Sequence, residues 1–185
     1  MKDWALYKSN TVVENHKEFV NLCHTVHRKF KDFNKDLDST SSYNSYNFFT
    51  ASDFHPLSYN LLKDIKVSIK DYIGEDKPIF IRAWLSFHMP SEVLDWHQHE
   101  IECHGYVSIE PKFTETLFKD KMSTEEDCDY KVINEIGKIY IGPGRRWHSV
   151  FVKKSYLQPR ITIAFDIVHE FDRSLTGSWS FIPVL

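Results

Sequence analysis

The residues of this 185-residue chain that are most able to do chemistry gather first in the stretch "DWHQHEIECHG", residues 95–105. His97 and His99 are two residues apart, so on an extended strand their imidazoles lie on the same side and can bind one ion. Zinc, iron and copper all accept imidazole, which does not choose among them. The pair alone favours a polar strand end over a metal site. A third histidine, His148, follows the turn "GPGRRW" and begins another candidate strand, which favours the metal site.

A second candidate set lies in "RITIAFDIV", residues 160–168. Alternation along a strand places Ile161, Ile163, Phe165 and Ile167 on an apolar face and Arg160, Thr162, Ala164 and Asp166 on the other. A guanidinium beside a hydroxyl can bind a carboxylate inside a cavity. An ion pair between Arg160 and a surface acid at the start of the strand is the open alternative.

The sequence pattern of the elements that must position these residues changes from helical spacing to strand alternation after Pro78. Apolar residues recur at helical spacing over 14–31 and 56–73, and the Ser/Asn-rich segment 36–47 is typical of a loop. We expect an α+β domain in which an antiparallel sandwich or barrel is backed by helices. The predicted strands are residues 79–89, 94–99, 104–110, 115–118, 138–141, 148–152 and 160–168, with an acidic loop at 120–130.

Length and composition limit the classes of protein. A chain of this length predicts a single domain over 1–185, with a mainly helical part at 1–77, a strand-rich core at 78–168 and a C-terminal extension at 169–185. The net charge of −3 does not favour nucleic acid as a partner. The three cysteines are widely separated, which indicates the cytoplasm and no disulfide framework, and the lack of a long apolar run predicts no membrane association.

Taken in order, "HQH" at 97–99, "GPGRRWHSV" at 142–150 and "RITIAFDIV" at 160–168 resemble the Fe(II)/2-oxoglutarate-dependent dioxygenases, especially small phage and bacterial oxygenase-like proteins. The resemblance covers roughly residues 78–168. It implies a double-stranded β-helix (a jelly-roll, cupin-like fold) with the N-terminal helices packed on one sheet. It also implies Fe(II) as cofactor, with 2-oxoglutarate, O2 and an unknown prime substrate as partners.

Carried over residue by residue, the resemblance makes His97 and His148 metal ligands and assigns Arg160 and Thr162 to the far carboxylate of 2-oxoglutarate. The family's first motif is His-x-Asp or His-x-Glu, so the histidine at position 99 is a departure. Three-histidine iron sites occur in cupin-type oxygenases, and we therefore keep His99 as the third ligand. Glu100 or Glu102 would replace it if the strand bulged or turned at this point.

Two other functions remain open. A catalytic zinc with bound water also uses three histidines of this kind, which predicts a hydrolytic or hydration enzyme. A non-catalytic jelly-roll module for binding or assembly, with a degenerate site, is the other. His88 and His104 are candidates to support the ligands from behind, and substrate selection is expected in loops 36–55 and 119–131.

Overall fold

A computed structural model describes residues 3–33, 35, 38–75, 78–90, 92, 94–120, 128–169 and 180–184. Its helices are α1 (Asn10–Glu14), α2 (His16–Phe33), α3 (Phe48–Ala51) and α4 (Pro56–Ile73). Its strands are β1 (Ala5–Lys8), β2 (Ile79–His88), β3 (Cys103–Glu110), β4 (Thr114–Lys119), β5 (Tyr130–Ile133), β6 (Lys138–Pro143), β7 (Trp147–Val152), β8 (Arg160–Val168) and β9 (Ile182–Val184).

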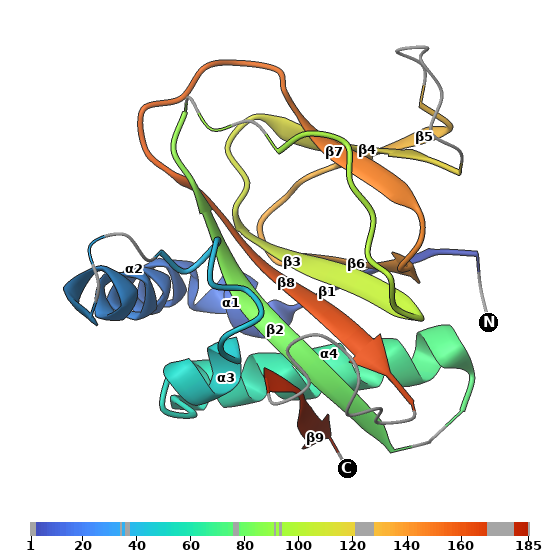
Figure 1. The fold of residues 1–185 in the computed structure, drawn as a ribbon, viewed down its shortest axis with the longest axis horizontal. Helices are drawn as coiled ribbons and strands as arrows, with labels where there is room; N and C mark the ends of the chain where they lie inside the picture. The colour runs from blue at the N-terminus through green and yellow to red at the C-terminus, as the bar shows by residue number, and fades with distance from the viewer. Residues whose placement is uncertain are drawn as a thin grey trace.

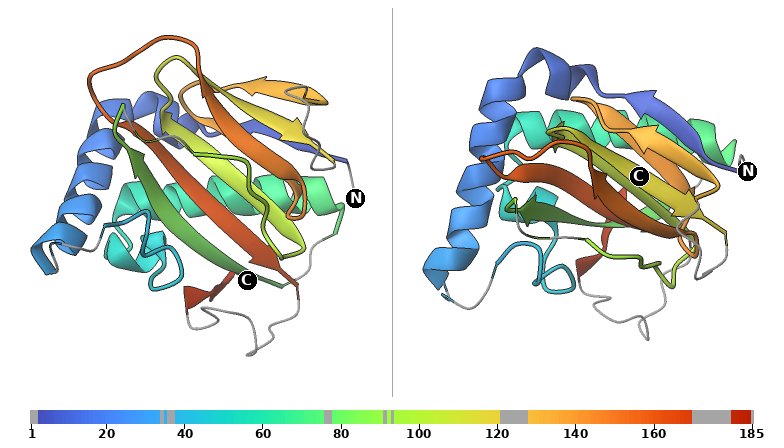
Figure 2. Two further views of the ribbon diagram at one scale, coloured as in Figure 1. Left: turned by 45° about the horizontal axis from the view of Figure 1, so that its top comes forward. Right: turned by 90° about the horizontal axis from the view of Figure 1, so that it is seen from above.

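Two antiparallel sheets face each other, and the helices cover the outer face of the larger one (Figures 1 and 2). The large sheet has the strand order β1-β6-β3-β8-β2-β9, and the small sheet has the order β5-β4-β7. Every strand pair within them is antiparallel. The mixed helical and antiparallel-sheet architecture agrees with the predicted α+β class.

The core is divided by β8, in the middle of the large sheet. Ile163, Phe165 and Ile167 belong to the cluster that packs with α2 and α4, whereas Ala164 belongs to a second cluster that joins the two sheets. This is the division of faces that the alternation of residues 160–168 predicts. The even-numbered side chains of β8, including Arg160, Thr162 and Asp166, therefore face the small sheet.

The helix predicted over 56–73 is confirmed as α4. Pro56 occupies its first turn, where the missing N–H costs nothing. Gly74 ends it in the left-handed conformation, with φ of 80°. The helix predicted over 14–31 is confirmed as α2, which begins at His16 because the chain leaves helical geometry at Asn15; Glu14 belongs to the short helix α1.

One predicted strand is wrong. Residues 94–99 form no strand, and within the described part of this segment only an isolated bridge pairs His97 with His148. The segment is anchored instead by four backbone hydrogen bonds to the 142–150 region, too few and too scattered to form a continuous ladder. The pattern also failed to predict β1, α3, β5 and β9, all of five residues or fewer.

Two expectations fall partly on residues outside the described part. Of the acidic loop at 120–130, residues 121–127 lie outside it, and β5 begins at Tyr130. Of the extension at 169–185, residues 182–184 form β9, which pairs with β2 at the edge of the large sheet. The three cysteines are free thiols. In the described part of the chain no helix is long and apolar enough to cross a membrane.

Candidate metal and carboxylate site

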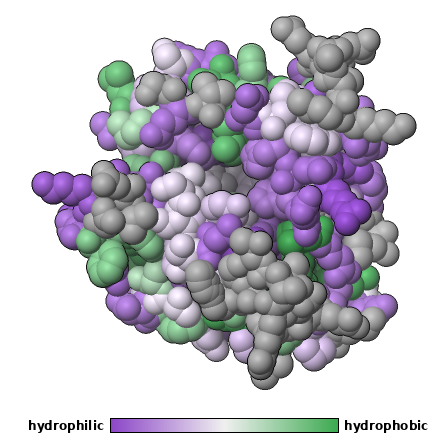
Figure 3. Space-filling model, viewed as in Figure 1, coloured by the Kyte–Doolittle hydropathy of each residue, from purple (hydrophilic) through white to green (hydrophobic). Residues whose placement is uncertain are grey.

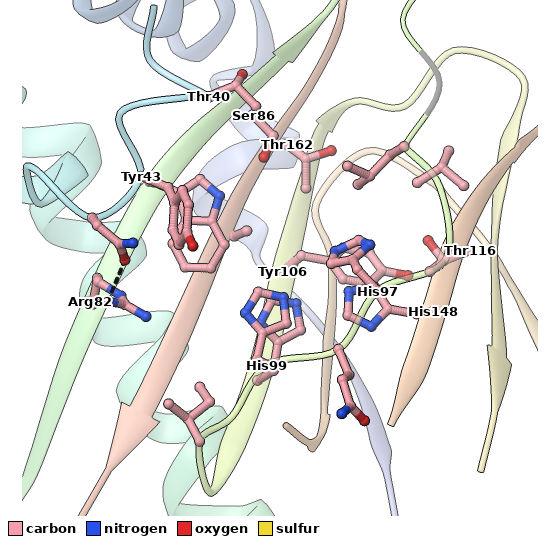
Figure 4. A pocket seen from close by; sticks show the side chains of 18 of the residues that line it. Thr40, Tyr43, Arg82, Ser86, His97, His99, Tyr106, Thr116, His148 and Thr162 are labelled. Atoms are coloured by element: carbon pink, nitrogen blue, oxygen red, sulfur yellow. Dashed lines mark hydrogen bonds between the residues drawn. The ribbon is translucent and has the colours of Figure 1, made fainter. Parts of the chain in front are cut away.

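His97 and His148 are brought together by reciprocal backbone hydrogen bonds. The His97 N–H donates to the His148 carbonyl at 3.0 Å, and the His148 N–H donates to the His97 carbonyl at 2.9 Å. Their ring centroids are 4.2 Å apart, and the ring of His99 lies 5.5 Å from His97 and 5.4 Å from His148. One donor atom from each of the three lies within 4.8 Å of the others. Figure 4 shows the three imidazoles gathered on one side of the cavity.

A glycine turn holds the backbone of His99 in place. The His99 N–H donates to the Gly144 carbonyl at 2.9 Å, and the Gly144 N–H donates to the Glu102 carbonyl at 3.1 Å. A Cβ atom on Gly144 would lie 2.3 Å from the backbone oxygen of Ile101. The two chain segments can therefore approach this closely only because residue 144 has no side chain.

The hydrogen bonds of the three imidazoles leave the same ring nitrogen available on each. Nδ1 of His97 lies 2.8 Å from the Asp95 carbonyl, and Nδ1 of His148 lies 3.0 Å from the Arg146 carbonyl. A carbonyl oxygen only accepts, so these two Nδ1 atoms carry the proton and the Nε2 atoms keep a lone pair. Nδ1 of His99 lies 3.2 Å from Oδ1 of Asp166, while its Nε2 is buried without a hydrogen-bond partner. Three available Nε2 atoms with fixed Nδ1 atoms are the usual arrangement of a histidine metal site.

Burial favours the neutral form of His97 and of His148. It lowers the pKa of His148 well below its usual value and lowers that of His97, with the neighbouring histidines adding to the effect. A neutral imidazole has the lone pair that a metal ion requires. The donor set therefore fits a divalent metal ion bound through three Nε2 atoms.

Arg160 and Thr162 lie on the same face of the large sheet, and the side chain of each has a buried polar atom without a hydrogen-bond partner. The residues are 4% and 3% exposed, and Nε of Arg160 and Oγ1 of Thr162 are buried with no hydrogen-bond partner. No ion pair joins Arg160 to an acidic side chain among the described residues. Burial lowers the pKa of Arg160, but an arginine remains charged in proteins. The structure thus holds a buried cation and, on the same face, a buried hydroxyl that can also donate to an anion bound by that cation.

The neighbours of this pair on adjacent strands are also polar. Arg160 is in register with His88 of β2, and Thr162 lies between Ser86 of β2 and Ser108 of β3. Nδ1 of His88 and Oγ of Ser108 are likewise buried without partners. The arrangement fits a carboxylate, which could accept from the guanidinium and the hydroxyls at once.

One cavity of about 550 Å³ connects the two sets of residues. His97, His99 and His148 line it together with Arg160 and Thr162. In Figure 4, Ser86 and Thr162 lie side by side at a distance from the three histidines. The space-filling view shows a hollow between the two sheets, with hydrophilic residues gathered beside it (Figure 3). This volume accommodates a small organic molecule.

The structure brings all five predicted site residues to one cavity, which Glu100 also lines. The described residues contain two groups of metal-type donors, and neither includes Glu100 or Glu102. Glu102 instead lies 3.4 Å from Nε2 of His169. Of the two predicted supporting histidines, His104 stacks on His99 with 3.8 Å between ring centroids. His88, in contrast, lies beside Arg160.

Asp166 is the residue that the pattern analysis left without a role. It is fully buried, contacts His99, His104 and Arg82, and belongs to the second group of donors. Its place on the polar face of "RITIAFDIV" was a signal, since a charged residue in the middle of a central strand requires a partner.

The loops expected to select the substrate differ in their relation to the cavity. Thr40, Tyr43 and Asn44 of loop 36–55 line it. Of loop 119–131, no described residue lines it, and residues 121–127 lie outside the described part.

Comparison with known proteins finds similar folds but no similar sequence. No protein-family model and no curated protein matches this sequence. Solved structures do match. ThoJ, a non-heme monooxygenase in a nickel complex, has a TM-score of 0.63 at 12% identity, covering 90% of this chain and 74% of ThoJ. SnoK, a non-heme alpha ketoglutarate dependent carbocyclase from nogalamycin biosynthesis, has a TM-score of 0.60 at 9% identity, covering 89% and 79%.

A third solved structure is that of the epimerase SnoN with Fe3+, alpha ketoglutarate and nogalamycin RO. It has a TM-score of 0.58 at 10% identity, covering 91% of this chain and 80% of SnoN. At such identities the likeness establishes a shared fold. The proteins that share it are a non-heme monooxygenase, a non-heme alpha ketoglutarate dependent carbocyclase and an epimerase in complex with Fe3+ and alpha ketoglutarate.

Proposed function

We propose that this protein is a non-haem Fe(II)- and 2-oxoglutarate-dependent oxygenase of the hydroxylase type, built on a double-stranded β-helix formed by the two facing sheets. His97, His99 and His148 would hold the metal. Arg160 and Thr162 would bind the far carboxylate of 2-oxoglutarate. The shared fold supports this proposal but does not by itself assign an activity.

The observation that carries the proposal is the buried Arg160, which has no acidic partner among the described residues and lines the same cavity as the three histidines. An uncompensated buried charge is costly, so its presence in a cavity indicates an anionic ligand. A metal alone would not need it. A dicarboxylate that reaches from the metal to Arg160 accounts for both sets of residues.

The roles of the protein's own groups follow from this arrangement. The three histidines would hold the metal through their Nε2 atoms, and the cavity that they line would receive 2-oxoglutarate beside it. Thr162 and Arg160 would orient the co-substrate, and the walls of the cavity would exclude bulk water. When bound, the iron supplies the redox chemistry in which one oxygen atom of O2 enters succinate, with release of CO2, and the other enters the substrate.

A zinc enzyme of the hydrolytic or hydration class has the same three-histidine donor set in its favour. It gives no role to the unpartnered groups of Arg160 and Thr162. One assay separates the two functions. Purified protein is incubated with Fe(II), ascorbate and labelled 2-oxoglutarate, with and without O2, and succinate is measured.

We expect O2-dependent succinate formation, weak without the prime substrate. The result that would refute the oxygenase is no succinate from a protein that retains zinc against an excess of iron. A protein that binds neither metal would instead support the non-catalytic jelly-roll module.

A further inference from the structure

A buried carboxylate stands directly behind the candidate metal site. Asp166 has no exposed surface and lies on the inner face of β8, in register with Arg82 of β2 and with His104 of β3. Its Oδ1 lies 3.2 Å from Nδ1 of His99 and 3.1 Å from Nδ1 of His104. The proposed oxygenase function, with its three metal ligands, gives Asp166 no part.

The two oxygens of Asp166 serve different partners. Oδ2 accepts from Nε and Nη2 of Arg82 at 3.2 and 2.5 Å, which leaves Oδ1 for the two imidazoles. The Arg82 guanidinium that pairs with this buried carboxyl favours its ionised form, so Asp166 is a carboxylate with a fixed orientation.

An ionised carboxylate accepts hydrogen bonds and does not donate them. Nδ1 of His99 and Nδ1 of His104 must therefore both carry protons, and in the neutral imidazole Nε2 then keeps its lone pair. For His99 this is the nitrogen that is buried without a partner. For His97 and His148 a backbone carbonyl enforces the same tautomer, whereas His99 depends on a side chain.

We propose that Asp166 is a positioning residue that fixes the Nδ1–H tautomer and the ring orientation of His99, so that Nε2 of His99 is presented to the metal. The inference rests on the proposed metal site. Arg82 holds the carboxylate in place, and the His104 ring stacks on that of His99 with an interplanar angle of 13°. The family that the sequence resembles has an acidic ligand where this chain has His99. Here the acid nearest to that position is Asp166, which contacts the imidazole of His99 on the side away from the proposed metal.

The Asp166→Asn variant tests the proposal because Arg82 dictates how an asparagine would turn. Arg82 only donates, so it would keep the amide oxygen and direct the NH2 group toward Nδ1 of His99 and His104. These two imidazoles would then need a lone pair on Nδ1 and a proton on Nε2. Asp64→Asn is the matched control, since Asp64 accepts a hydrogen bond from Ser9 in the helical part.

Two measurements are made on metal-free protein and on protein titrated with zinc alone. Ring nitrogen NMR of 15N-labelled protein, at a pH where the imidazoles are neutral, reports the tautomer of each histidine. We expect Nδ1–H for His97, His99, His104 and His148 in the wild type and in Asp64→Asn. In Asp166→Asn, His99 and His104 should change to Nε2–H while His97 and His148 do not. Zinc affinity should fall about 10- to 100-fold, as for other residues that orient a ligand.

An Nε2–H tautomer at His99 in the wild type would overturn the proposal even if Asp166→Asn did not fold. Equal zinc affinity in the wild type and a folded Asp166→Asn variant would also overturn it, while leaving the metal site in place. A wild type that binds no zinc would instead refute the proposed function, and this inference with it.

Discussion

The two buried arginines on the inner face of the large sheet should respond in opposite ways to the same substitution. Arg82 and Arg160 are 6% and 4% exposed, but only Arg82 has a carboxylate partner among the described residues. Removing one member of a buried ion pair costs about 3–5 kcal/mol, because the other charge is left uncompensated. Arg82→Met should therefore lower the melting temperature by roughly 6–20 °C in a chain of this size. Arg160→Met removes a charge that has no partner, so the melting temperature of the ligand-free protein should stay the same or rise.

The cost of Arg160→Met should appear only in binding. Truncating one partner of a buried charge pair costs about 2–5 kcal/mol, which corresponds to a loss of affinity of roughly 30- to 4,000-fold. The assay is isothermal titration of 2-oxoglutarate into metal-loaded protein, with Arg145→Met, an exposed arginine of the same turn as His148, as control. Unchanged 2-oxoglutarate affinity, or a ligand-free Arg160→Met protein as destabilised as Arg82→Met, would refute the reasoning.

Three further predictions concern the residues around the site. His148→Ala should abolish stoichiometric zinc binding, measured by equilibrium dialysis; retained zinc would place the metal elsewhere. Gly144→Ala should destabilise the fold by about 1–3 kcal/mol, measured by urea unfolding, because its Cβ meets the Ile101 backbone; wild-type stability would contradict the close approach. Burial, and to a smaller extent the charge of Arg160, lower the pKa of His88 in the folded protein to about 4. As the pH drops from the ordinary histidine pKa toward 4, the unfolded chain therefore binds a proton that the folded protein does not, and the free energy of unfolding falls. His88→Asn should remove about 3 kcal/mol of that fall, measured by unfolding at a series of pH values, and an unaltered acid limb would be the contrary result.

The parts of the fold that could be predicted were those with a sustained period. The helix over 56–73 buries one regular face, and the strand over 160–168 alternates strictly between an apolar and a mainly polar face, so the spacing of their residues was sufficient. The segment 94–99 could not be predicted, because its conformation depends on hydrogen bonds to residues that are distant in sequence. The short strand β9 pairs with β2, which is also distant in sequence.

In the candidate site, too, the sequence could not predict features that depend on contacts between residues distant in the chain. The histidines and Arg160 could be singled out because their residue types and order carry information. The role of Asp166 could not, because it depends on the register that sets β2, β3 and β8 side by side and brings Arg82 and His104 to the same carboxylate. That His99 rather than Glu100 or Glu102 faces the other two histidines is also decided by tertiary contacts, chiefly the turn at Gly144.

The central claim is that the three histidines and Arg160 bind one ligand between them. The most direct test is the affinity of wild-type protein for 2-oxoglutarate with and without a bound redox-inert metal such as zinc. If one molecule reaches both, metal should tighten 2-oxoglutarate binding, and 2-oxoglutarate should tighten metal binding by the same factor. Affinities that are independent of each other would contradict the claim and separate the metal site from the carboxylate site.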